Sequence, residues 1–410
     1  MGEESAVPLG RRIATLRKAK GMTQQDFAEA LKRSSSWVSQ VERGTRLVDR
    51  QSVLQKMAVV LGVPSQTFLT SDDEHHGTWI APARGSVEIL RSALAGHPVP
   101  EQALGSTGSL PSGRSDLSLL VEESSRAWTL VHDAGYEEAA PLLAMLIDGL
   151  EHTTRQTGAS DPSAFSALAS TYQAAAALLV KLDDVGAAWV AADRAITAGE
   201  RCGDRLLVLA GQYRMAHLFV HARELPLARH VLSRALQALV PDAAATDVGF
   251  CSLAGACALL LAVLSARDND ARSAERHLKM ATGLARRVGP GRNEFDTEFG
   301  PANVLMHRVA VDVELGNAGQ ALLDAKHVDL RGLSPERQAR YLVDVARAHA
   351  MRRSLREAVA CLERAEALAP GEIANLAVVH ELLVDLVNLA GRSQVSGLRH
   401  LAERLGAAQN

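Results

Sequence analysis

The chain has 410 residues, of which 47% are hydrophobic, 22% are charged and only 4% are aromatic, and its formal net charge is −3. This length exceeds what one hydrophobic core usually organises, so we expect two or more folding units. The shortage of aromatic residues disfavours β-sandwiches, whose strands need aromatic and β-branched side chains. We therefore predict an all-α protein rich in alanine and leucine.

Charge is distributed unevenly along the chain. Residues 1–70 contain 11 Lys and Arg against 6 Asp and Glu, a balance of +5, whereas residues 116–410 contain 30 against 36, a balance of −6. A basic amino-terminal unit joined to an acidic body indicates that one end alone binds an anionic partner.

Cysteine usage and the amino terminus bear on the compartment. The four cysteines (Cys202, Cys251, Cys257 and Cys361) lie in apolar segments without a CxxC pair, which is typical of small core residues in a reducing environment. The first ten residues lack a basic region followed by an apolar stretch, and no segment approaches about 20 uninterrupted apolar residues. We expect a cytoplasmic protein that does not bind a membrane.

Apolar spacing and capping residues predict the first helices. Leu9, Ile13 and Leu16 repeat at helical spacing, and a glycine five residues later ends the first helix. Thr23 then supplies a hydroxyl N-cap with Asp26 three residues on, before the short buried face of a second helix (Phe27, Ala28 and Leu31).

A third helix is predicted after a short turn. Ser34 or Ser35 can cap it, Val38 and Val41 point inward, and Gly44 stops it. The remaining positions form a short polar face rich in hydrogen-bonding side chains.

The segments TQQDFA and VSQVERG combine capping, packing and termination signals at a fixed separation. With them, residues 8–69 resemble the five-helix helix-turn-helix domain of the phage-repressor-like (xenobiotic-response-element) regulators. The fourth and fifth helices of that domain would correspond to residues 50–61 and 65–69. In that family the second of the two short helices enters the major groove, which places the helix at residues 35–43 there.

The resemblance implies a set of DNA-binding residues. They are Gln24, Arg33, Ser35, Ser36, Trp37, Ser39, Gln40, Arg43, Arg46 and Arg50. Gln40 is the first choice as a base reader, because glutamine can form two hydrogen bonds to an adenine edge. Gln24 is expected at a phosphate, and the arginines, Arg17 included, supply attraction to the DNA backbone. By analogy with the family, Arg17 also pairs with Glu42 beneath this surface.

Two places in the domain allow a second interpretation. Trp37 either faces DNA or packs as a partly exposed hydrophobic residue. Lys32 and Arg33 occupy turn positions that the family usually fills with a glycine and an aliphatic residue, which leaves the turn geometry open.

Residues 71–115 are predicted to form a linker. The segment contains scattered Gly, Pro and Ser and one short helical patch around residues 87–94. Its GSTGSLPSG sequence lacks the Gly-Lys-Ser/Thr ending of a phosphate-binding loop, so the linker interpretation is favoured.

The body at residues 116–410 repeats a small-residue pattern. The repeats are Ala188-Ala192-Ala195, Ala228-Leu232-Ala235, Ala274-Leu278-Ala281 and Ala358-Leu362-Ala365, with a degenerate unit near Ala321. Small residues at fixed positions allow paired helices to approach closely, and each pair buries its face on the next. Residues 355–370 resemble the tetratricopeptide repeat, so we predict an α-solenoid of six or seven helical pairs.

A solenoid of this kind has a concave surface that can bind an effector. The repeat register places Gln173, Tyr213, His217, Asn303 and Arg347 toward it, where each either contacts a ligand or is satisfied within the helices. His217 and His221 have the spacing that can share a metal, but no third ligand is identifiable and we expect no metal. We also expect neither cofactor nor enzymatic activity, since no catalytic motif is present.

Together these features predict a bacterial transcriptional regulator with an amino-terminal domain, residues 1–70, that binds double-stranded operator DNA. The repeat domain would form a homodimer and sense a signal. Because regulators of this layout include quorum-sensing proteins, the resemblance implies a peptide or small-molecule effector. The alternative is a tetratricopeptide adaptor that recruits a partner, with a small domain that only localises it. Sequence-specific DNA binding distinguishes the two hypotheses.

Overall fold

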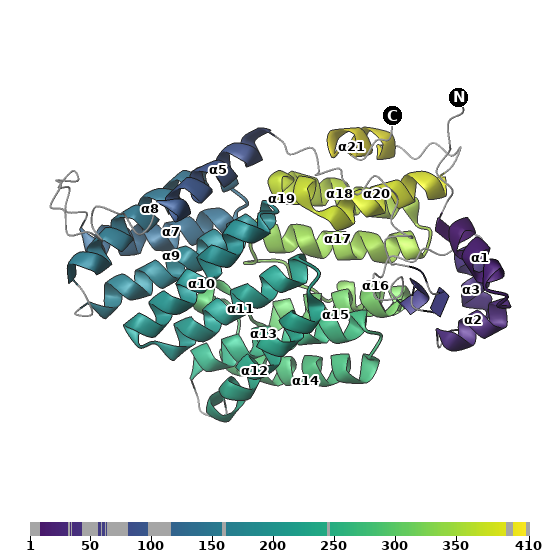
Figure 1. The fold of residues 1–410 in the computed structure, drawn as a ribbon, viewed down its shortest axis with the longest axis horizontal. Coiled ribbons are helices and arrows are strands. Elements are labelled where there is room, and N and C mark those ends of the chain that lie inside the picture. Colours follow the sequence, from purple (N-terminus) through teal and green to yellow (C-terminus); the bar gives the residue numbers. More distant parts are fainter. Residues whose placement is uncertain are drawn as a thin grey trace. The chain divides into compact units, whose positions relative to one another are not determined.

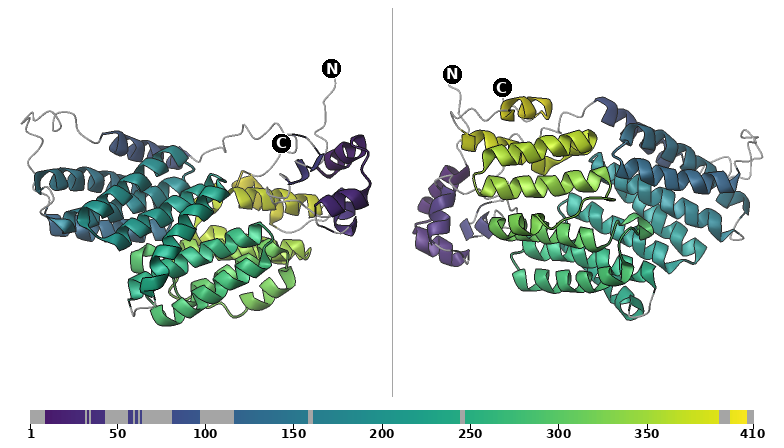
Figure 2. Two further views of the ribbon diagram at one scale, coloured as in Figure 1. Left: turned by 60° about the horizontal axis from the view of Figure 1, so that its bottom comes forward. Right: turned by 180° about the vertical axis from the view of Figure 1, so that it is seen from behind.

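The computed structural model describes residues 9–31, 33, 35–42, 56–58, 60, 61, 63, 81–96, 116–157, 161–243, 247–390 and 397–406. All regular secondary structure in these residues is helical (Figures 1 and 2), which confirms the all-α prediction. The chain divides into two compact units, Met1–Thr78 and Trp79–Asn410.

The first unit contains the helices expected near the amino terminus. They are α1 (Leu9–Ala19), α2 (Gln24–Ala30) and α3 (Ser35–Glu42), and residues 56–58 and 60–61 are also helical. Their apolar faces form a small core that includes Ile13, Phe27, Ala28, Val38, Val41, Met57 and Leu61. The predicted fourth helix is present in its described part, whereas the fifth, at residues 65–69, lies outside the described residues.

The second unit is a succession of helical hairpins. Its helices are α5 (Ala81–Ala95), α7 (Leu117–His132), α8 (Tyr136–Thr157), α9 (Pro162–Lys181), α10 (Val185–Cys202), α11 (Arg205–His221), α12 (Leu225–Ala243), α13 (Val248–Arg267), α14 (Ala271–Val288), η3 (Glu294–Asp296), α15 (Pro301–Leu315), α16 (Ala318–Ala325), α17 (Pro335–Met351), α18 (Leu355–Leu368), α19 (Pro370–Asn375), α20 (Ala377–Ala390) and α21 (Leu398–Arg404). Consecutive helices from α7 to α18 pack as pairs, and each pair packs on the next (Figure 1).

The small-residue repeats lie in the core of these hairpins. Their members, from Ala188 in α10 to Ala365 in α18, are all buried, and so is Ala321 of the degenerate unit in α16. A larger side chain at such a position would push the paired helices apart, because interiors are close-packed. The predicted succession of helical pairs is therefore observed.

The turns within the hairpins share one backbone geometry. Each contains a residue in the left-handed region, namely Ala134, Asp183, Arg223, Asn269, Gly316 or Arg353. The next residue's N–H donates five residues back, as from Asp184 to the Leu179 carbonyl at 2.9 Å and from Ser354 to the His349 carbonyl at 2.9 Å. This bond satisfies a terminal carbonyl of the first helix and reverses the chain within a few residues.

The predicted linker is wrong for residues 81–95, which form α5. This helix buries Val87, Leu90 and Leu94 and packs against α8. The apolar positions of its short helical patch are spaced three and four residues apart, so they form one face that α8 covers. The second unit thus begins before residue 116.

Two helices of the second unit are long and apolar enough to span a membrane by length and composition. They are α9 and α13, and 72% and 78% of their most apolar 18-residue windows are buried inside the protein. Neighbouring helices cover them on most sides, which accounts for their composition as core helices.

Candidate nucleic-acid interface and repeat-domain interior

A capping box fixes the start of α2. The Thr23 hydroxyl accepts a hydrogen bond from the Asp26 backbone N–H (3.1 Å), and the Asp26 carboxylate accepts one from the Thr23 backbone N–H (2.9 Å). The hydrogen bonds that Thr23 donates hold the pKa of Asp26 below its ordinary value. The predicted cap is confirmed, and it sets the direction in which α2 leaves the preceding turn.

A buried polar network joins α1, α2 and α3. Arg17 donates from Nε and Nη2 to the two carboxylate oxygens of Glu42 at 2.5 and 2.9 Å, and from Nη1 to the Met22 carbonyl at 2.6 Å. Gln24 Nε2 donates to Oε2 of Glu42 at 2.7 Å. Burial alone would raise the pKa of Glu42, but the hydrogen bonds from Arg17 and Gln24 outweigh it and hold that pKa below its ordinary value.

This network confirms the Arg17–Glu42 pair and corrects one phosphate assignment. Arg17 is only 6% exposed, so its charge is used inside the domain and it is not a backbone contact for DNA. Gln24 is half-buried, and part of its amide holds the carboxyl end of α3. Such bidentate pairs fix orientation as well as distance, so α3 is held rigidly against α1 and α2.

The two faces of α3 differ as the sequence predicts. Val38 and Val41 are buried, Ser35 is exposed and Ser39 is half-buried. Ser36 and Gln40 lie within α3, but their side chains are outside the described residues, as are Arg43, Arg46 and Arg50 in full. The described part of the outer face is therefore polar and lies opposite the core.

Trp37 is a core residue, which corrects its place among the DNA-facing residues. It is 9% exposed and belongs to the same apolar cluster as Ile13 and Phe27. The guanidinium of Arg33 lies 5.4 Å from the centre of its ring. Burial of a large aromatic side chain stabilises the domain, and the ring is then not available to a base.

A glycine that the sequence analysis did not select positions α3 against α1. A Cβ atom on Gly10 would lie 2.4 Å from the Val41 carbonyl oxygen and 2.9 Å from that of Glu42. The carboxyl end of α3 thus touches the backbone of α1, which only glycine permits.

The residues expected on a concave effector surface are mostly enclosed. Gln173 is 2% exposed and donates to the Leu207 carbonyl at 3.3 Å. Asn303 is 3% exposed and donates from Nδ2 to the Glu298 carbonyl at 3.1 Å. Arg347 pairs with Glu314 and Asp344, each at 3.2 Å. Apart from Asp344, which is one turn away on the same helix as Arg347, their partners come from other helices or loops. These three residues therefore hold the protein together and do not form an open surface.

Tyr213 and His217 lie beside a partly buried cation, Arg214. Tyr213 is 6% exposed and packs edge-on against the ring of His217 at 4.6 Å. Arg214, which the sequence analysis missed, lies 4.6 Å from the ring centre of Trp128 and donates to the carbonyls of Phe295 and Asp296 at 2.8 and 2.9 Å. Burial in these surroundings lowers the pKa of His217 well below its ordinary value.

The connection from α14 to α15 enters this interior. Phe295, Asp296 and Glu298 adopt left-handed backbone conformations. Phe299 is fully buried, and a Cβ on Gly255 would lie 1.9 Å from its ring. The connection is therefore part of the core, where its carbonyls and carboxylates meet the charges of several helices.

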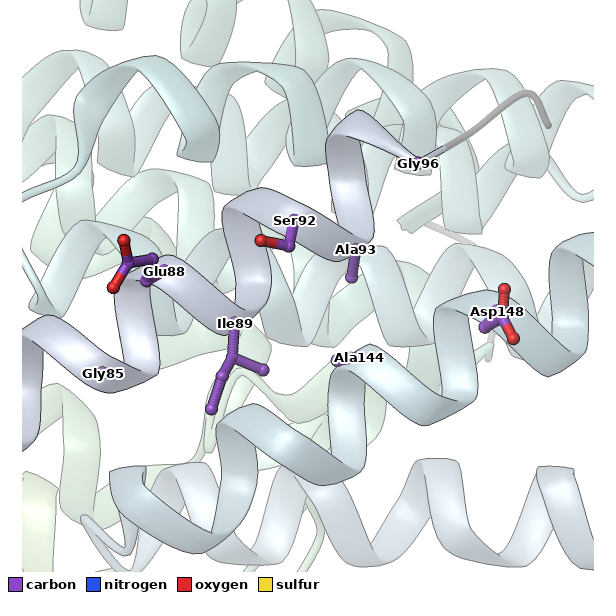
Figure 3. Close-up of a pocket in the computed structure, with 8 residues that line it drawn as sticks. All are labelled: Gly85, Glu88, Ile89, Ser92, Ala93, Gly96, Ala144 and Asp148. Atoms are coloured by element: carbon purple, nitrogen blue, oxygen red, sulfur yellow. The ribbon is translucent and has the colours of Figure 1, made fainter. Parts of the chain in front are cut away.

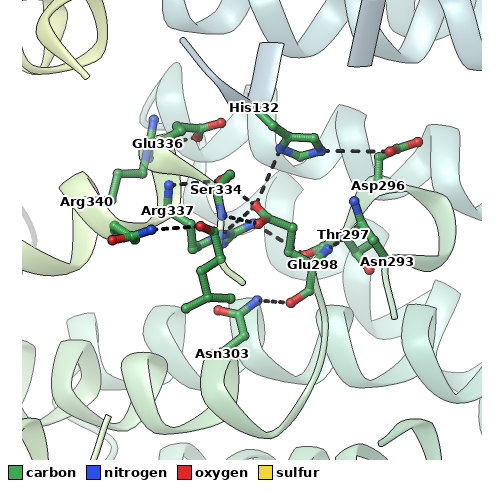
Figure 4. Close-up of polar contacts among 12 residues, drawn as sticks. His132, Asn293, Asp296, Thr297, Glu298, Asn303, Ser334, Glu336, Arg337 and Arg340 are labelled. Atoms are coloured by element: carbon green, nitrogen blue, oxygen red, sulfur yellow. Dashed lines mark hydrogen bonds and ion pairs between the residues drawn. The ribbon is translucent and has the colours of Figure 1, made fainter. Parts of the chain in front are cut away.

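Glu298 is the centre of one polar cluster (Figure 4). Its carboxylate accepts from the backbone N–H and hydroxyl of Ser334, each at 2.9 Å, and from Arg337 Nε at 3.4 Å, with His132 Nδ1 also 3.4 Å away. Burial alone would raise the pKa of Glu298, but Arg337 and Ser334 outweigh it and lower that pKa. The cluster brings α7 and α17 together at the connection before α15.

A second cluster, which we call the ionic seam, comprises Tyr136, Lys181, Glu336, Arg340 and Glu372. Lys181 Nζ pairs with Glu336 and lies 3.6 Å from Glu372 Oε2. Glu372 also accepts from the Tyr136 hydroxyl and from Arg340 Nε, each at 2.5 Å. The seam joins the first hairpins of the second unit to α17 and α19. Lys181, Glu336 and Glu372 are largely removed from water, whereas the side chain of Arg340 is 43% exposed.

A surface groove lies between α5 and α8 (Figure 3). It has a volume of about 610 Å³ and is lined by Gly85, Glu88, Ile89, Ser92, Ala93, Gly96, Ala144 and Asp148. Its walls are mostly small or apolar, with one carboxylate from each helix. No residue predicted from the sequence lies in it.

The two histidines spaced for a shared metal have separate partners, and Cys257 lies in the core. His221 Nε2 lies 2.7 Å from Asp183 Oδ1, whereas His217 faces Tyr213, so the two imidazoles do not share a site. Within the described ranges, no group of three or more His, Cys, Asp or Glu residues is placed to hold a metal ion. Burial raises the pKa of the Cys257 thiol to about 12, which keeps it protonated as a core residue.

The amino-terminal geometry agrees with comparisons to known proteins. A family model described as a helix-turn-helix domain matches residues 8–68. The uncharacterized HTH-type transcriptional regulator YazB of Bacillus subtilis is 46% identical over 54 residues, which are 13% of this chain and 77% of that protein. The chain belongs to the helix-turn-helix family. In this helix-turn-helix protein, α2 and α3 are the two helices of the motif.

A solved structure matches a longer part of the chain. It is PlcR of Bacillus thuringiensis, solved in complex with the peptide PapR7 and DNA, which has 14% sequence identity to this chain and a TM-score of 0.27. The match covers 68% of this chain and 95% of that one.

Proposed function

We propose that this protein is a sequence-specific DNA-binding transcriptional regulator and that α3 is its recognition helix. The observation that carries the proposal is the buried Arg17–Gln24–Glu42 network, which holds α3 in the domain matched by the helix-turn-helix family. A rigid helix with Val38 and Val41 in the core presents its polar side outward, as major-groove reading requires.

Within this proposal the residues divide by role. Ser35, Ser36, Ser39 and Gln40 face base edges and neighbouring phosphates, with Gln40 as the principal reader. Arg43, Arg46 and Arg50 contribute attraction to the DNA backbone, which weakens as salt concentration rises. Gln24 contacts a phosphate while part of its amide holds Glu42.

The experiment is selection of bound sites from a random DNA pool with the full-length protein, followed by gel-shift titration. Gln40→Ala should weaken binding to the selected site by about 1–3 kcal/mol and leave binding to unrelated DNA unchanged. Arg46→Ala should weaken binding to all DNA sequences alike. It should also reduce the slope of log affinity against log salt concentration by about one. Gln237→Ala on the exposed face of α12 is the matched control. Failure to enrich any site, together with no binding at low salt, would sink the proposal.

We further propose that the repeat domain acts in the cytoplasm as a homodimerisation and signal-sensing module without enzymatic activity. Its hairpins resemble tetratricopeptide repeats, and an effector of peptide or small-molecule class would have to prefer one arrangement of the hairpins over another. Light scattering on the full-length protein tests the dimer. A monomer at every concentration that still binds a two-fold symmetric site cooperatively would contradict dimerisation before DNA binding.

A further inference from the structure

A second cavity lies between α8, α9 and α10 of the second unit. It has a volume of about 150 Å³. The charged and aromatic residues of its lining are Glu151, Arg155, Phe165, Tyr172, Arg194 and Arg201. At roughly 30 Å³ per water, this volume holds about five water molecules, enough for a small oxyanion group.

Two arginines are held over buried rings along one side of the cavity. The Arg201 guanidinium lies 5.9 Å from the ring centre of Phe165, and that of Arg194 lies 5.9 Å from the ring centre of Tyr172. The two arginines are seven residues apart on α10, and the two rings are seven residues apart on α9. Because Phe165 and Tyr172 are only 4% and 1% exposed, the surface under the guanidinium groups is rigid.

Positive charge in the cavity exceeds what its lining neutralises. Glu151 is the only lining carboxylate among the described residues, and it accepts from the Tyr172 hydroxyl at 2.8 Å and from Arg155 at 3.0 Å. Three guanidinium groups line the cavity with this one carboxylate, and Arg194 also donates to the Leu94 carbonyl at 2.9 Å. Arg201 has no hydrogen-bond or ion-pair partner among the described residues. The unneutralised charge is therefore concentrated at the end of the cavity where Arg201 covers Phe165.

We propose that this cavity binds the oxyanion group of a small molecule, with phosphate as the model group. Planar guanidinium groups bond tetrahedral oxyanions through paired N–H donors, and the rigid rings hold two of them in place before the ligand arrives. Arg201 supplies the main charge, and Arg155 approaches from α8. The site indicates that the signal in the proposed sensing role carries an oxyanion group. Only the regulatory meaning of the site rests on that role, and the binding itself does not.

The binding step is tested without DNA. Full-length protein is titrated with inorganic phosphate at constant pH and ionic strength, with chloride as the replacing anion, and binding is followed by calorimetry and by broadening of the phosphate ³¹P signal. Saturable binding is expected. Its absence overturns the site, whatever the outcome of the DNA experiments.

Variants identify the groups responsible. Arg201→Gln should weaken phosphate binding about tenfold, a typical loss for one charge-assisted contact. Glu151→Gln should strengthen it several-fold, because the lining then lacks its negative charge. Arg356→Gln on the exposed face of α18 is the control and should bind as the wild type does. If Arg201→Gln binds phosphate as tightly as the wild type while retaining its circular dichroism spectrum, the proposal is overturned.

Discussion

Replacing Lys181 by methionine should destabilise the second unit by unpairing buried carboxylates in the ionic seam. Lys181 is 9% exposed in its side chain, and its partners Glu336 and Glu372 are 11% and 2% exposed. Methionine keeps the length and apolar contacts of the side chain but removes its charge. Glu336 and Glu372 would then share only Arg340, which lies 3.4 Å from the first and 2.5 Å from the second.

The size of the effect follows from the cost of leaving a buried charge without its partner, which is about 3–5 kcal/mol. The pKa of Glu336 gives a second, independent measure of this energy. Burial alone would raise its pKa, but Lys181, Arg340 and Arg337 lower it from 4.5 to about 2. A depressed carboxylate pKa contributes stability above the unfolded pKa and loses it as pH falls through the folded pKa, and a shift of this size corresponds to about 3 kcal/mol.

The assay is urea unfolding of the full-length chain followed by circular dichroism at several pH values. At pH 7 Lys181→Met should lower the free energy of unfolding by about 3–5 kcal/mol. Below about pH 4 the difference from the wild type should shrink, because Glu336 is then protonated in the unfolded chain and in the variant's folded state. Adding Glu336→Gln to Lys181→Met should restore part of the loss.

Lys279→Met is the matched control for this prediction. Its side chain is 75% exposed and pairs with Glu275 only at 3.8 Å on the same helix, so the expected change is below about 0.5 kcal/mol. A loss for Lys181→Met that stays constant from pH 7 down to about pH 3 would refute the electrostatic reasoning. It would indicate lost packing instead.

Two further substitutions test the backbone arguments. Gly10→Ala should destabilise the first unit by about 1–3 kcal/mol and weaken DNA binding, because its Cβ would meet the Val41 carbonyl. The control is Gly85→Ala, whose Cβ would have nothing within 4 Å and which should be neutral or stabilising. Melting temperature and gel shift measure the two effects. Arg353→Gly should raise the free energy of unfolding by up to about 1 kcal/mol, because Arg353 has φ 61° in an exposed turn. Arg352→Gly, at φ −91°, should give no such gain in urea unfolding, and equal effects at the two positions would contradict the conformational explanation.

The sequence by itself determined the features that depend on neighbouring residues. The Thr23 and Asp26 cap, the helical spacing of Ile13 and Leu16, and the alanine positions such as Ala188 follow from hydrogen bonds and periodicity within one or two turns. These local signals also identified α3 and its buried face. They were sufficient for the helical class and for the helix-turn-helix domain.

Tertiary structure decided which faces are covered and which charges meet. Trp37 and Gln173 have sequence surroundings compatible with exposure, but other parts of their own units enclose them. The seam brings Lys181 to Glu336 across 155 residues, and no local pattern encodes such a pairing. A local hint of a charge in the interior is Arg214 of α11, whose neighbours Tyr213, Met215 and Ala216 are buried. Its partners depend on how the hairpins stack, because burial and Coulomb interaction act through space and not along the chain.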